Sequence, residues 1–470
     1  MTIGLPIEIK VREYLSKIFF GIKLVEKLNQ DVLIGEKNKV YSFFKNSKNF
    51  YLISKGGPAS LFKFEKKKFS NNYLGLLDEE APLTNITKQE LLPRVHKKIL
   101  SNVDDYFTWG KKDESIIKNL IQNKKKIYTF GHPKFDLLKK ENLSIFNSEV
   151  KDIKKRYKNL IFIPSSFITD QVLGDKRTDN YQIEQFLNKK SKKIKIEYRK
   201  SRRYEEQNYQ EFIKLLLEIS ENNPNYNFVF RPHPRQSVNL IKNRFLRLPK
   251  NLHIIFKGTV TPWIIACDLY IHYGCTSSFE ASILKKKIIL FVKEEKAYKG
   301  RNLTLFKSLG YTFNNYEKCK DFINYHLKNN LRKLNQSKPP VKYISNSEKI
   351  SFHSNFIKFF RKKYSKKLSN INHNNIKKIF KKKRISLLKD RLSFVKNVII
   401  KNETFIDIIK SFNSNLLLTK EYKKKKFDKI SFLEIKRNIK NLSKNLDLKT
   451  QIKVMQIDKN LFLLCQKRKK

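Results

Sequence analysis

Residues 227–234 combine two anion-binding side chains with the end of a short apolar strand. The segment reads Asn-Phe-Val-Phe-Arg-Pro-His-Pro, and its two prolines cannot continue the hydrogen-bond ladder of a sheet. Arg231 and His233 are therefore expected in a stiff turn, where both side chains can point at one anion. The alternative is that this turn only ends the strand.

A second apolar run, residues 269–271, is followed by three hydroxyl side chains and then by a helical pattern. The hydroxyls are those of Thr276, Ser277 and Ser278, and apolar spacing from Phe279 onward indicates the helix. Such a hydroxyl can cap a helix, and the free amide groups of a helix N-terminus attract phosphate. Because open α/β sheets bind ligands at the carboxyl ends of their strands, the two segments together predict a nucleotide-phosphate site. For the second segment, a simple helix cap is the alternative.

The strands that carry these segments belong to two series of alternating strand and helix patterns. In the first series, residues 12–28 carry apolar side chains near helical spacing, between strand patterns at 5–9 and 32–34. The second series begins with the strand pattern of 160–163 and includes a helical pattern at 209–221. Repeated strand–helix units predict a mostly parallel sheet in each series.

These patterns and the distribution of charge divide the chain into three parts. We expect an α/β fold with Rossmann-like domains over 1–155 and 156–335 that face a cleft, and a basic, mainly helical extension over 336–470. With 470 residues, of which 40% are hydrophobic, the chain is large enough to build a core in both domains. Pro339 and Pro340 separate the second domain from the lysine-rich extension.

Positive charge is concentrated in the extension. The chain carries a net charge of +58, and residues 336–470, with 37 Lys or Arg and 9 Asp or Glu, contribute +28 of it. Such a charge favours nucleic acid or an anionic membrane as partner. Aromatic and basic residues are interleaved in 356–364, which suits either RNA or an anionic membrane, and no RNA-binding motif accompanies them, so nucleic acid is not favoured. The expected apolar anchors are Phe356, Phe359, Phe360, Leu387, Leu388 and Leu392.

The cysteine pattern and the apolar runs bear on location. The four cysteines contain no CxxC pair and lie in apolar contexts, so neither disulfide bonds nor a zinc site is expected. No apolar run approaches the ~20 residues that span a bilayer, and the N-terminus lacks the pattern of a secretion signal. We therefore expect a cytoplasmic protein that associates peripherally with the inner face of the cell membrane.

Six segments within residues 1–310 carry a family pattern: Pro6–Glu13, Leu77–Glu80, Thr108–Gly110, Gly131–Asp136, Arg231–Pro234 and Thr276–Glu280. Together they resemble the GT-B architecture of glycosyltransferases and sugar-nucleotide epimerases. More narrowly, they resemble the bacterial family of surface carbohydrate biosynthesis proteins, related in pattern to transferases of Kdo, sialic acid and polyol phosphate. The chain departs from the pattern at Ala81, where the family has glycine, and at residues 131–134, which read Gly-His-Pro-Lys instead of Gly-Asn-Pro-Arg.

The resemblance implies glycosyl transfer, and this chemistry assigns roles to the acidic residues after the strand pattern of 73–77. An acceptor hydroxyl must lose its proton as it attacks, so a carboxylate at a strand end is suited to act as general base. The candidates, in order of preference, are Glu80, Glu79 and Asp78. Three adjacent acids can instead form only the first turn of a helix.

The leaving nucleoside phosphate gains charge as its bond to the sugar breaks. We expect His233 to stabilise this charge, with donor contacts from Arg231, Thr276, Ser277, Ser278, Glu280 and His132. Glu280 can bind a sugar or ribose hydroxyl or only complement the helix dipole, and the Gly-His-Pro turn of His132 can be purely structural. No DxD-like pair lies in a suitable loop, so we expect neither a metal ion nor another cofactor.

We therefore predict a metal-independent glycosyltransferase that moves a sugar from a nucleotide-activated donor, such as a CMP-linked acidic sugar, to a cell-surface polysaccharide or a lipid-linked acceptor. Residues 1–155 would hold the acceptor, and residues 156–335 would bind the nucleotide sugar. A sugar-nucleotide 2-epimerase and a polyol-phosphate transferase are alternatives on the same fold. A non-catalytic basic protein that binds RNA or a membrane is the alternative from another class.

Overall fold

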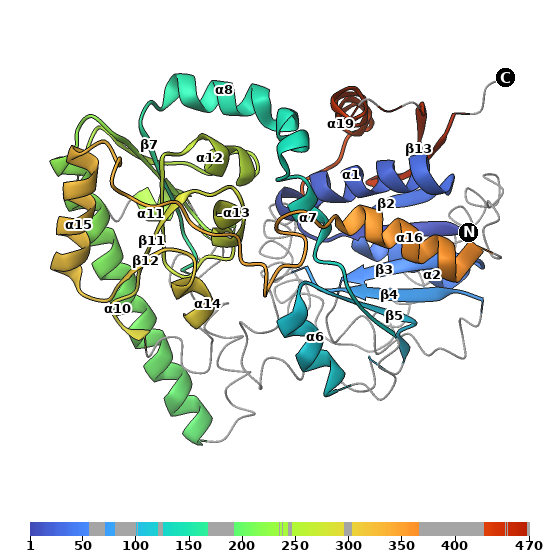
Figure 1. Cartoon of the computed structure of the whole chain (residues 1–470), viewed down its shortest axis with the longest axis horizontal. Helices are drawn as coiled ribbons and strands as arrows, with labels where there is room; N and C mark the ends of the chain where they lie inside the picture. The colour runs from blue at the N-terminus through green and yellow to red at the C-terminus, as the bar shows by residue number, and fades with distance from the viewer. Residues whose placement is uncertain are drawn as a thin grey trace, which may run out of the picture. The chain divides into compact units, whose positions relative to one another are not determined.

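The computed structural model describes residues 1–55, 71–79, 100–120 except 101, 126–167, 192–295 except 235, 237 and 243–246, 303–365, and 427–467 except 447 and 449. These residues form two compact units, each built around one sheet (Figure 1). Unit 1 comprises Met1–Glu80, Leu91–Leu137 and Tyr343–Lys470, and unit 2 consists mainly of Leu138–Lys342. The expected α/β fold with two Rossmann-like sheets is confirmed.

This division differs from the expected boundaries on both sides of the second domain. Residues 138–155 belong to unit 2, because helix α8 (Asn147–Arg156) packs against α12 (Thr261–Ala266). Residues after Lys342 belong to unit 1, so the described parts of the expected extension contribute helices and strands to the first unit.

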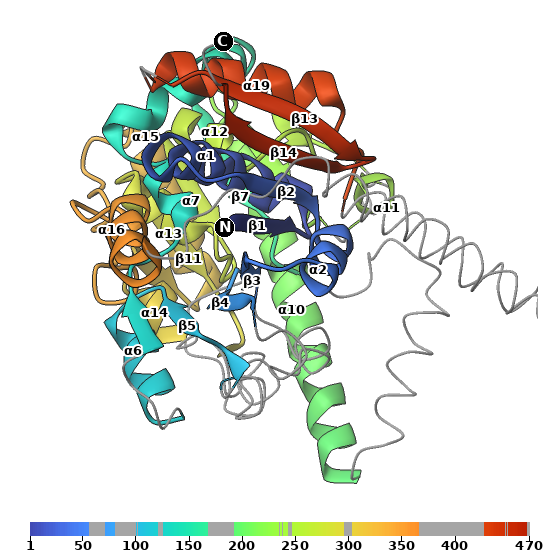
Figure 2. The same cartoon turned by 90° about the vertical axis from the view of Figure 1, so that its right-hand side faces the viewer.

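The sheet of unit 1 has the strand order β13-β14-β2-β1-β3-β4-β5-β6. Its strands are β1 (Thr2–Ile7), β2 (Val32–Glu36), β3 (Phe50–Lys55), β4 (Tyr73–Leu77), β5 (Asp105–Thr108), β6 (Ile127–Thr129), β13 (Ile452–Asp458) and β14 (Leu461–Gln466). Strands β1 to β6 are parallel, and the hairpin β13–β14 adds antiparallel strands beside β2 (Figure 2). The doubly wound order β2-β1-β3-β4-β5 reverses between β1 and β3, and we call this reversal the switch point of unit 1.

Six helices of unit 1 are described: α1 (Lys10–Leu28), α2 (Lys37–Asn46), α6 (Lys111–Lys118), α7 (Pro133–Asp136), α16 (Phe352–Tyr364) and α19 (Phe432–Asn445). Helix α1 packs on β1, β2 and β14, and its side chains Ile18, Phe20 and Ile22 are fully buried. It ends at Asn29, which adopts the left-handed conformation (φ 52°) and donates its amide hydrogen bond to the carbonyl of Val25.

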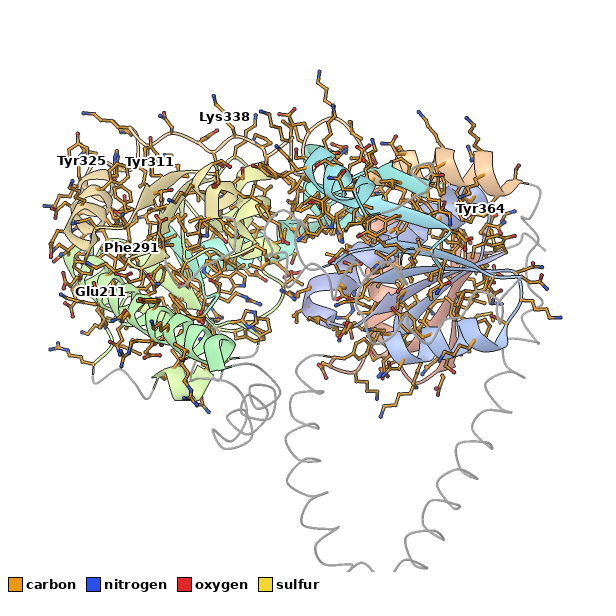
Figure 3. The ribbon with its side chains drawn as sticks, turned by 90° about the horizontal axis from the view of Figure 1, so that it is seen from below. Glu211, Phe291, Tyr311, Tyr325, Lys338 and Tyr364 are labelled. Carbon is orange, nitrogen blue, oxygen red and sulfur yellow. The ribbon has the colours of Figure 1, made fainter. Side chains whose placement is uncertain are left out.

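Helix α16 returns from the C-terminal part of the chain and packs its aromatic face on unit 1. Phe356 and Phe360 are fully buried, and the Phe359 ring lies 4.4 Å from that of Tyr128. At the end of the helix, the hydroxyl of Tyr364 (Figure 3) donates to the buried carboxylate of Asp105 at 2.6 Å. The expectation that Phe356 and Phe360 are membrane anchors is therefore wrong, because these two rings form part of the core. Phe359 is half-buried against Tyr128, and Leu387, Leu388 and Leu392 lie outside the described residues.

The sheet of unit 2 has the strand order β12-β11-β10-β7-β8-β9, and all of its pairings are parallel. Its strands are β7 (Leu160–Pro164), β8 (Asn227–Arg231), β9 (Leu252–Ile254), β10 (Leu269–His272), β11 (Lys287–Phe291) and β12 (Tyr311–Phe313). The other helices among its described residues are η4 (Lys140–Phe146), α10 (Lys192–Asn222), α11 (Val238–Lys242), α13 (Ser278–Ile283), α14 (Leu303–Lys307) and α15 (Tyr316–Lys328). The order reverses between β7 and β10, which is the switch point of unit 2.

Candidate functional site

The loops at the switch point of unit 2 include the second predicted segment. Sheets of this order bind ligands at the carboxyl ends of the two strands that flank the reversal. Here these ends are followed by Ser165 and Ser166 after β7, and by residues 273–277 after β10. The hydroxyl of Ser166 donates to the carbonyl of Tyr273, so the two loops are in direct contact. The first predicted segment consists of β8, the neighbour of β7, and the turn that follows it.

Arg231, the last residue of β8, binds backbone carbonyls. Its Nη1 donates to the carbonyl of Lys257 at 2.7 Å and its Nη2 to that of Gly258 at 2.6 Å, while the guanidinium lies 4.7 Å from the ring centroid of Phe256. The residue is only 6% exposed, and burial lowers its pKa to about 10, so it stays charged at neutral pH. Arg231 thus fixes the loop after β9 and places a positive charge near Cys275 of the switch point.

His233 lies in a turn that Gln236 closes. The amide of His233 donates to Oε1 of Gln236 at 2.7 Å, and the amide of Gln236 donates back to the carbonyl of His233 at 2.8 Å. Pro232 and Pro234 restrict the same turn. The stiff turn expected from the sequence is therefore present, and its half-buried imidazole retains access to solvent.

The hydroxyl of Ser277 does not cap the helix that follows it. Helix α13 begins at Ser278, and Ser277 occupies the N-cap position without a side-chain capping hydrogen bond. Its Oγ instead lies 2.8 Å from the hydroxyl of Tyr270 and 3.0 Å from Sγ of Cys275. The expected cap is wrong for Ser277, because the side chain bonds back to β10 and its own loop. Thr276 is half-buried and Ser278 is fully buried, and their contact with phosphate stays a prediction.

Two further side chains hold the loop after β10. Nδ1 of His272 accepts the amide hydrogen bond of Cys275 at 3.1 Å, and burial lowers the pKa of His272 to about 3, so the imidazole is neutral. Glu280 accepts a hydrogen bond from Thr261 Oγ1 at 2.9 Å, which ties α13 to the start of α12. The hydrogen bond from Thr261 gives Glu280 a structural role, and its predicted contact with the sugar donor stays a prediction.

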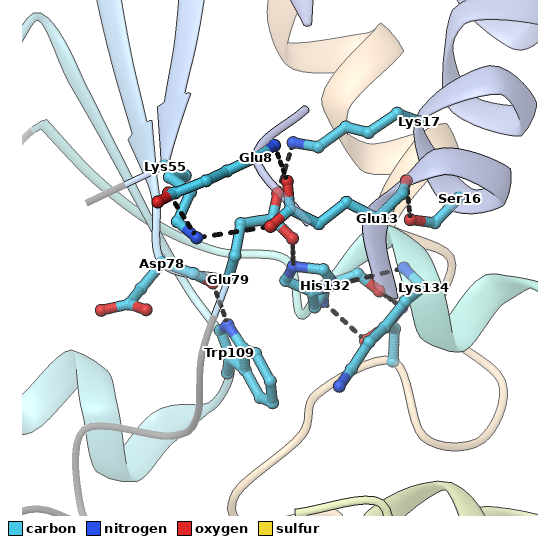
Figure 4. Close-up of polar contacts among 11 residues, drawn as sticks. Glu8, Glu13, Ser16, Lys17, Lys55, Asp78, Glu79, Trp109, His132 and Lys134 are labelled. Carbon is cyan, nitrogen blue, oxygen red and sulfur yellow. Dashed lines mark hydrogen bonds and ion pairs between the residues drawn. The ribbon is translucent and has the colours of Figure 1, made fainter. Parts of the chain in front are cut away.

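In unit 1, the acidic residue Glu79 lies in a buried cluster of charged side chains (Figure 4). Glu79 follows β4, and its carboxylate lies between Nζ of Lys17 on α1 and Nε2 of His132, which is 2.8 Å away. The Lys17, Glu79 and His132 side chains are at most 3% exposed. The sequence prediction named Glu79 and His132 separately, and the structure brings them together.

His132 is held in one orientation by four contacts. Its Nδ1 accepts the amide hydrogen bond of Lys134 at 3.2 Å, so the ring proton is on Nε2 and is donated to Glu79. The side chain of Asn346 accepts from the His132 amide at 3.0 Å and donates to its carbonyl at 2.8 Å. The ring of Trp109 lies 4.9 Å from the imidazole. Gly131 must be glycine here, because its φ is 90° and a Cβ atom would lie 1.9 Å from Oδ1 of Asn346.

A second carboxylate, Glu13, lies at the switch point of unit 1. Its Oε2 accepts the amide hydrogen bond of Glu8, the residue after β1, at 2.8 Å, and its Oε1 lies 3.3 Å from Nζ of Lys55, the last residue of β3. Lys55 also pairs with Glu8 at 2.8 Å. These residues lie at the carboxyl ends of the two strands that flank the reversal, where ligands of such sheets bind.

The two buried carboxylates have pKa values that move in opposite directions. Burial alone would raise the pKa of Glu79, but the charge of Lys17 and the hydrogen bond from His132 lower it well below its usual value. Burial raises the pKa of Glu13, and the neighbouring charge of Glu79 adds to this rise against the opposing effect of Lys55. Burial lowers the pKa of His132, so that the imidazole is neutral. At neutral pH, Glu79 is therefore the fixed anion of the cluster.

Of the other two predicted acids, only Asp78 lies in the described part of the chain. The Asp78 carboxylate points away from Glu79 and His132 (Figure 4), and the Asp78 carbonyl accepts a hydrogen bond from Nε1 of Trp109 at 2.7 Å. Glu80, the preferred general base, lies outside the described residues.

Four residues that form or support the cluster were not identified from the sequence. These are Lys17, Lys55, Asn346 and Glu13, the last of which was not named as a site residue. Glu13 lies in the segment that carries the family resemblance, and Lys17 follows it by one helical turn, which places both on one face of α1. This four-residue spacing could have identified Lys17 from the sequence. Asn346 is 214 residues from His132, and no local pattern links the two.

Solved structures with a similar fold include a UDP-GlcNAc 2-epimerase from Methanocaldococcus jannaschii, in complex with UDP-GlcNAc and UDP. It aligns with a TM-score of 0.50 and 13% identity over 77% of this chain and 100% of its own. The chain has a GT-B fold. The wall teichoic acid polymerase TagF aligns with a TM-score of 0.48 and 13% identity over 78% of this chain and 90% of its own. Comparisons with protein-family models and with curated protein sequences gave no match.

At this identity the likeness establishes the fold and not the reaction. The GT-B resemblance stated from the sequence is therefore confirmed as an architecture, and the two doubly wound sheets account for it. Among the described residues, no helix is both long and apolar enough to cross a bilayer.

Proposed function

We propose that this GT-B protein is a metal-independent glycosyltransferase, which transfers a sugar from a nucleotide-activated donor to a polysaccharide or lipid-linked acceptor at the inner surface of the cell membrane. The observation that carries the proposal is the different chemistry at the two sheets. Loops at the carboxyl ends of unit 2 strands hold an arginine, a half-buried histidine and hydroxyls, which suit a phosphate. The corresponding positions of unit 1 hold buried carboxylates, which suit an acceptor hydroxyl.

In the proposed reaction, the acceptor oxygen bonds to the anomeric carbon while the bond from that carbon to the phosphate oxygen breaks. The acceptor proton passes to a carboxylate, and the nucleoside phosphate leaves with the electron pair. Glu80 is the proposed base. Glu79 is the weaker candidate, because Lys17 and His132 hold it as an anion of lowered pKa and therefore of low basicity.

His233 is the proposed group that stabilises the leaving phosphate, because its turn is rigid while its imidazole is accessible. Thr276 is the proposed hydroxyl contact at the switch point. Arg231 supports the site by its charge and by its hold on residues 257–258, since its Nη1 and Nη2 already donate to backbone carbonyls. A CMP-linked acidic sugar is the donor that the sequence resemblance favours.

A sugar-nucleotide 2-epimerase is the second candidate, supported by the fold that this chain shares with the archaeal epimerase. The two reactions differ in their need for an acceptor. An epimerase interconverts free nucleotide sugars, whereas the proposed transferase releases nucleotide only when an acceptor is present. Conversion of a nucleotide sugar to its C2 epimer without acceptor would favour the epimerase.

Thermal unfolding in the presence of CMP, UDP, GDP and CDP compounds tests the nucleotide site. A ligand at a hundred times its Kd stabilises the native state by about 2.7 kcal/mol, so one nucleotide class is expected to raise the melting temperature. We expect H233A to lower turnover with that donor on the order of 10²-fold while its melting temperature without ligand is unchanged. Glu80→Gln is expected to retain the ligand-induced shift and to lose roughly 10²-fold or more in transfer. Normal transfer by both variants would refute the roles proposed for His233 and Glu80, loss of transfer with EDTA would refute metal independence, and absence of transfer from every nucleotide-activated donor would refute the proposed activity.

A further inference from the structure

Helix α19 is fixed to unit 1 through one apolar face. Ile435, Ile439 and Leu442 are at most 4% exposed, and the helix contacts α1 and β13. The hydroxyl of Ser431 caps its first turn by accepting the amide hydrogen bond of Glu434 at 3.0 Å. The Glu434 carboxylate pairs with Lys10 of α1 at 2.9 Å. The side chains on its opposite face are therefore presented by a rigid support.

That opposite face is basic. Lys436, Arg437, Lys440 and Lys444 are all exposed, and at about 100° per residue they fall within an arc of about 100° over roughly 12 Å of helix. Leu433 lies on the same stripe and is 73% exposed. Glu434, the one acidic residue in the α19 sequence, lies outside this arc. We call the five residues of this stripe the basic face.

We propose that the basic face of α19 docks on the anionic surface of a lipid bilayer. Each exposed Lys or Arg near such a surface is attracted by anionic headgroups, and four of them on one rigid face act together. Leu433 supplies a shallow apolar contact below the headgroups, as in helices that lie on membranes. No aromatic side chain is among the exposed residues of α19, so the face lacks the stacking surfaces that single-stranded nucleic acid uses.

This inference keeps the anionic membrane that the sequence predicts as partner of the basic extension, and it changes the residues that make the contact. The rings of Phe356 and Phe360 are in the core, whereas the face of α19 carries both charge and an exposed apolar residue. It rests on its own observation and does not depend on glycosyl transfer.

Co-sedimentation of the full-length protein with vesicles tests the proposal. The vesicles contain phosphatidylcholine alone or mixed with phosphatidylglycerol. The test variant, K436Q/R437Q/K440Q/K444Q, removes four charges from α19, and the control, K151Q/K154Q/K155Q/R156Q, removes four exposed charges from α8. Both variants have the same net charge, so the nonspecific attraction between the basic protein and anionic vesicles is the same in both.

We expect the α19 variant to lose on the order of 10²-fold in partition to the mixed vesicles, and the α8 control to lose less than about threefold. L433S is expected to lose roughly tenfold or less, and binding of the wild type weakens as salt rises. Unchanged melting temperatures would exclude misfolding of the variants, and we expect the wild-type protein not to bind vesicles of pure phosphatidylcholine. Equal losses in both charge variants would overturn the proposal. It would also be overturned if the α19 variant lost affinity for an RNA oligonucleotide but not for vesicles.

Discussion

The charged side chains of the two units are satisfied in different ways. In unit 1, Glu79 is held by other side chains, those of Lys17 and His132, and all three are buried. In unit 2, Arg231 is held by the backbone carbonyls of residues 257 and 258. Removal of either Glu79 or Lys17 is costly, because the charge of the other then remains buried without its partner. A side chain that binds backbone mainly shapes a loop, so its removal disturbs geometry more than charge.

The largest expected effect is that of Glu79→Gln. The substitution leaves Lys17 buried without its carboxylate, which costs about 3–5 kcal/mol of unfolding free energy. Glu114→Gln is the matched control, because Glu114 pairs with Lys118 at the surface, where such pairs contribute about 1 kcal/mol or less. Urea denaturation measures both. Adding Lys17→Met to Glu79→Gln should recover part of the loss, since no unpaired charge remains.

If Glu79→Gln and its control destabilised the protein equally, the cluster would not act as a buried network. Failure of the second substitution to recover stability would lead to the same conclusion, provided that Lys17→Met alone is destabilising.

A smaller effect is expected for Asp136→Asn, in the same segment as His132. The buried Asp136 carboxylate accepts from the amides of Phe352 and His353 at 3.2 and 3.0 Å, and it pairs with Nδ1 of His353 at 2.6 Å. It thereby holds the N-terminus of α16. Asparagine retains one acceptor oxygen but no charge, so we expect a loss of about 2–3 kcal/mol, measured by urea denaturation at neutral pH.

This loss should depend on pH. Burial would raise the pKa of Asp136, but His353 and the donated hydrogen bonds lower it well below its usual value. A carboxyl group of lowered pKa stabilises the fold above its unfolded pKa of about 3.9, and the contribution disappears as the pH falls through the folded pKa. The gap between wild type and Asp136→Asn should therefore shrink below about pH 4. A gap that stays constant from neutral pH to pH 3 would contradict this account.

Sequence patterns predicted the fold better than the buried cluster of Glu79. The reason is that the fold depends on residues close together in the sequence, whereas the cluster depends on residues far apart in it. The strand that ends at Arg231 and the turn that holds His233 depend on neighbouring residues, namely an apolar run and two prolines. The Glu79–His132 contact depends on two strand ends that only the folded sheet brings together. The hydrogen bonds of Asn346 with the backbone of His132 join residues that are 214 positions apart in the sequence.

Residues 352–364 show a different limit of local patterns. Aromatic side chains at helical spacing with intervening cations fit a membrane-binding helix, and they fit equally a helix that covers its own sheet. In the structure the rings pack on unit 1, as shown by Phe356 at 5.4 Å from Phe107 and Phe360 at 5.1 Å from Tyr51. Only the burial of the rings distinguishes the two, and burial is a tertiary property.

The smallest expected effect is that of Arg231→Lys, which retains the charge but not the fork that reaches both Lys257 and Gly258. We expect a loss of about 1–2 kcal/mol in unfolding free energy, because one of the two hydrogen bonds and the stacking on Phe256 are lost. Affinity for the bound nucleotide, measured by calorimetry, should fall less than about tenfold, since a lysine keeps the positive charge. If stability were unchanged while nucleotide binding was abolished, the guanidinium would contact phosphate directly. The contrast between a side-chain network in unit 1 and a backbone-anchored arginine in unit 2 would then not describe the site.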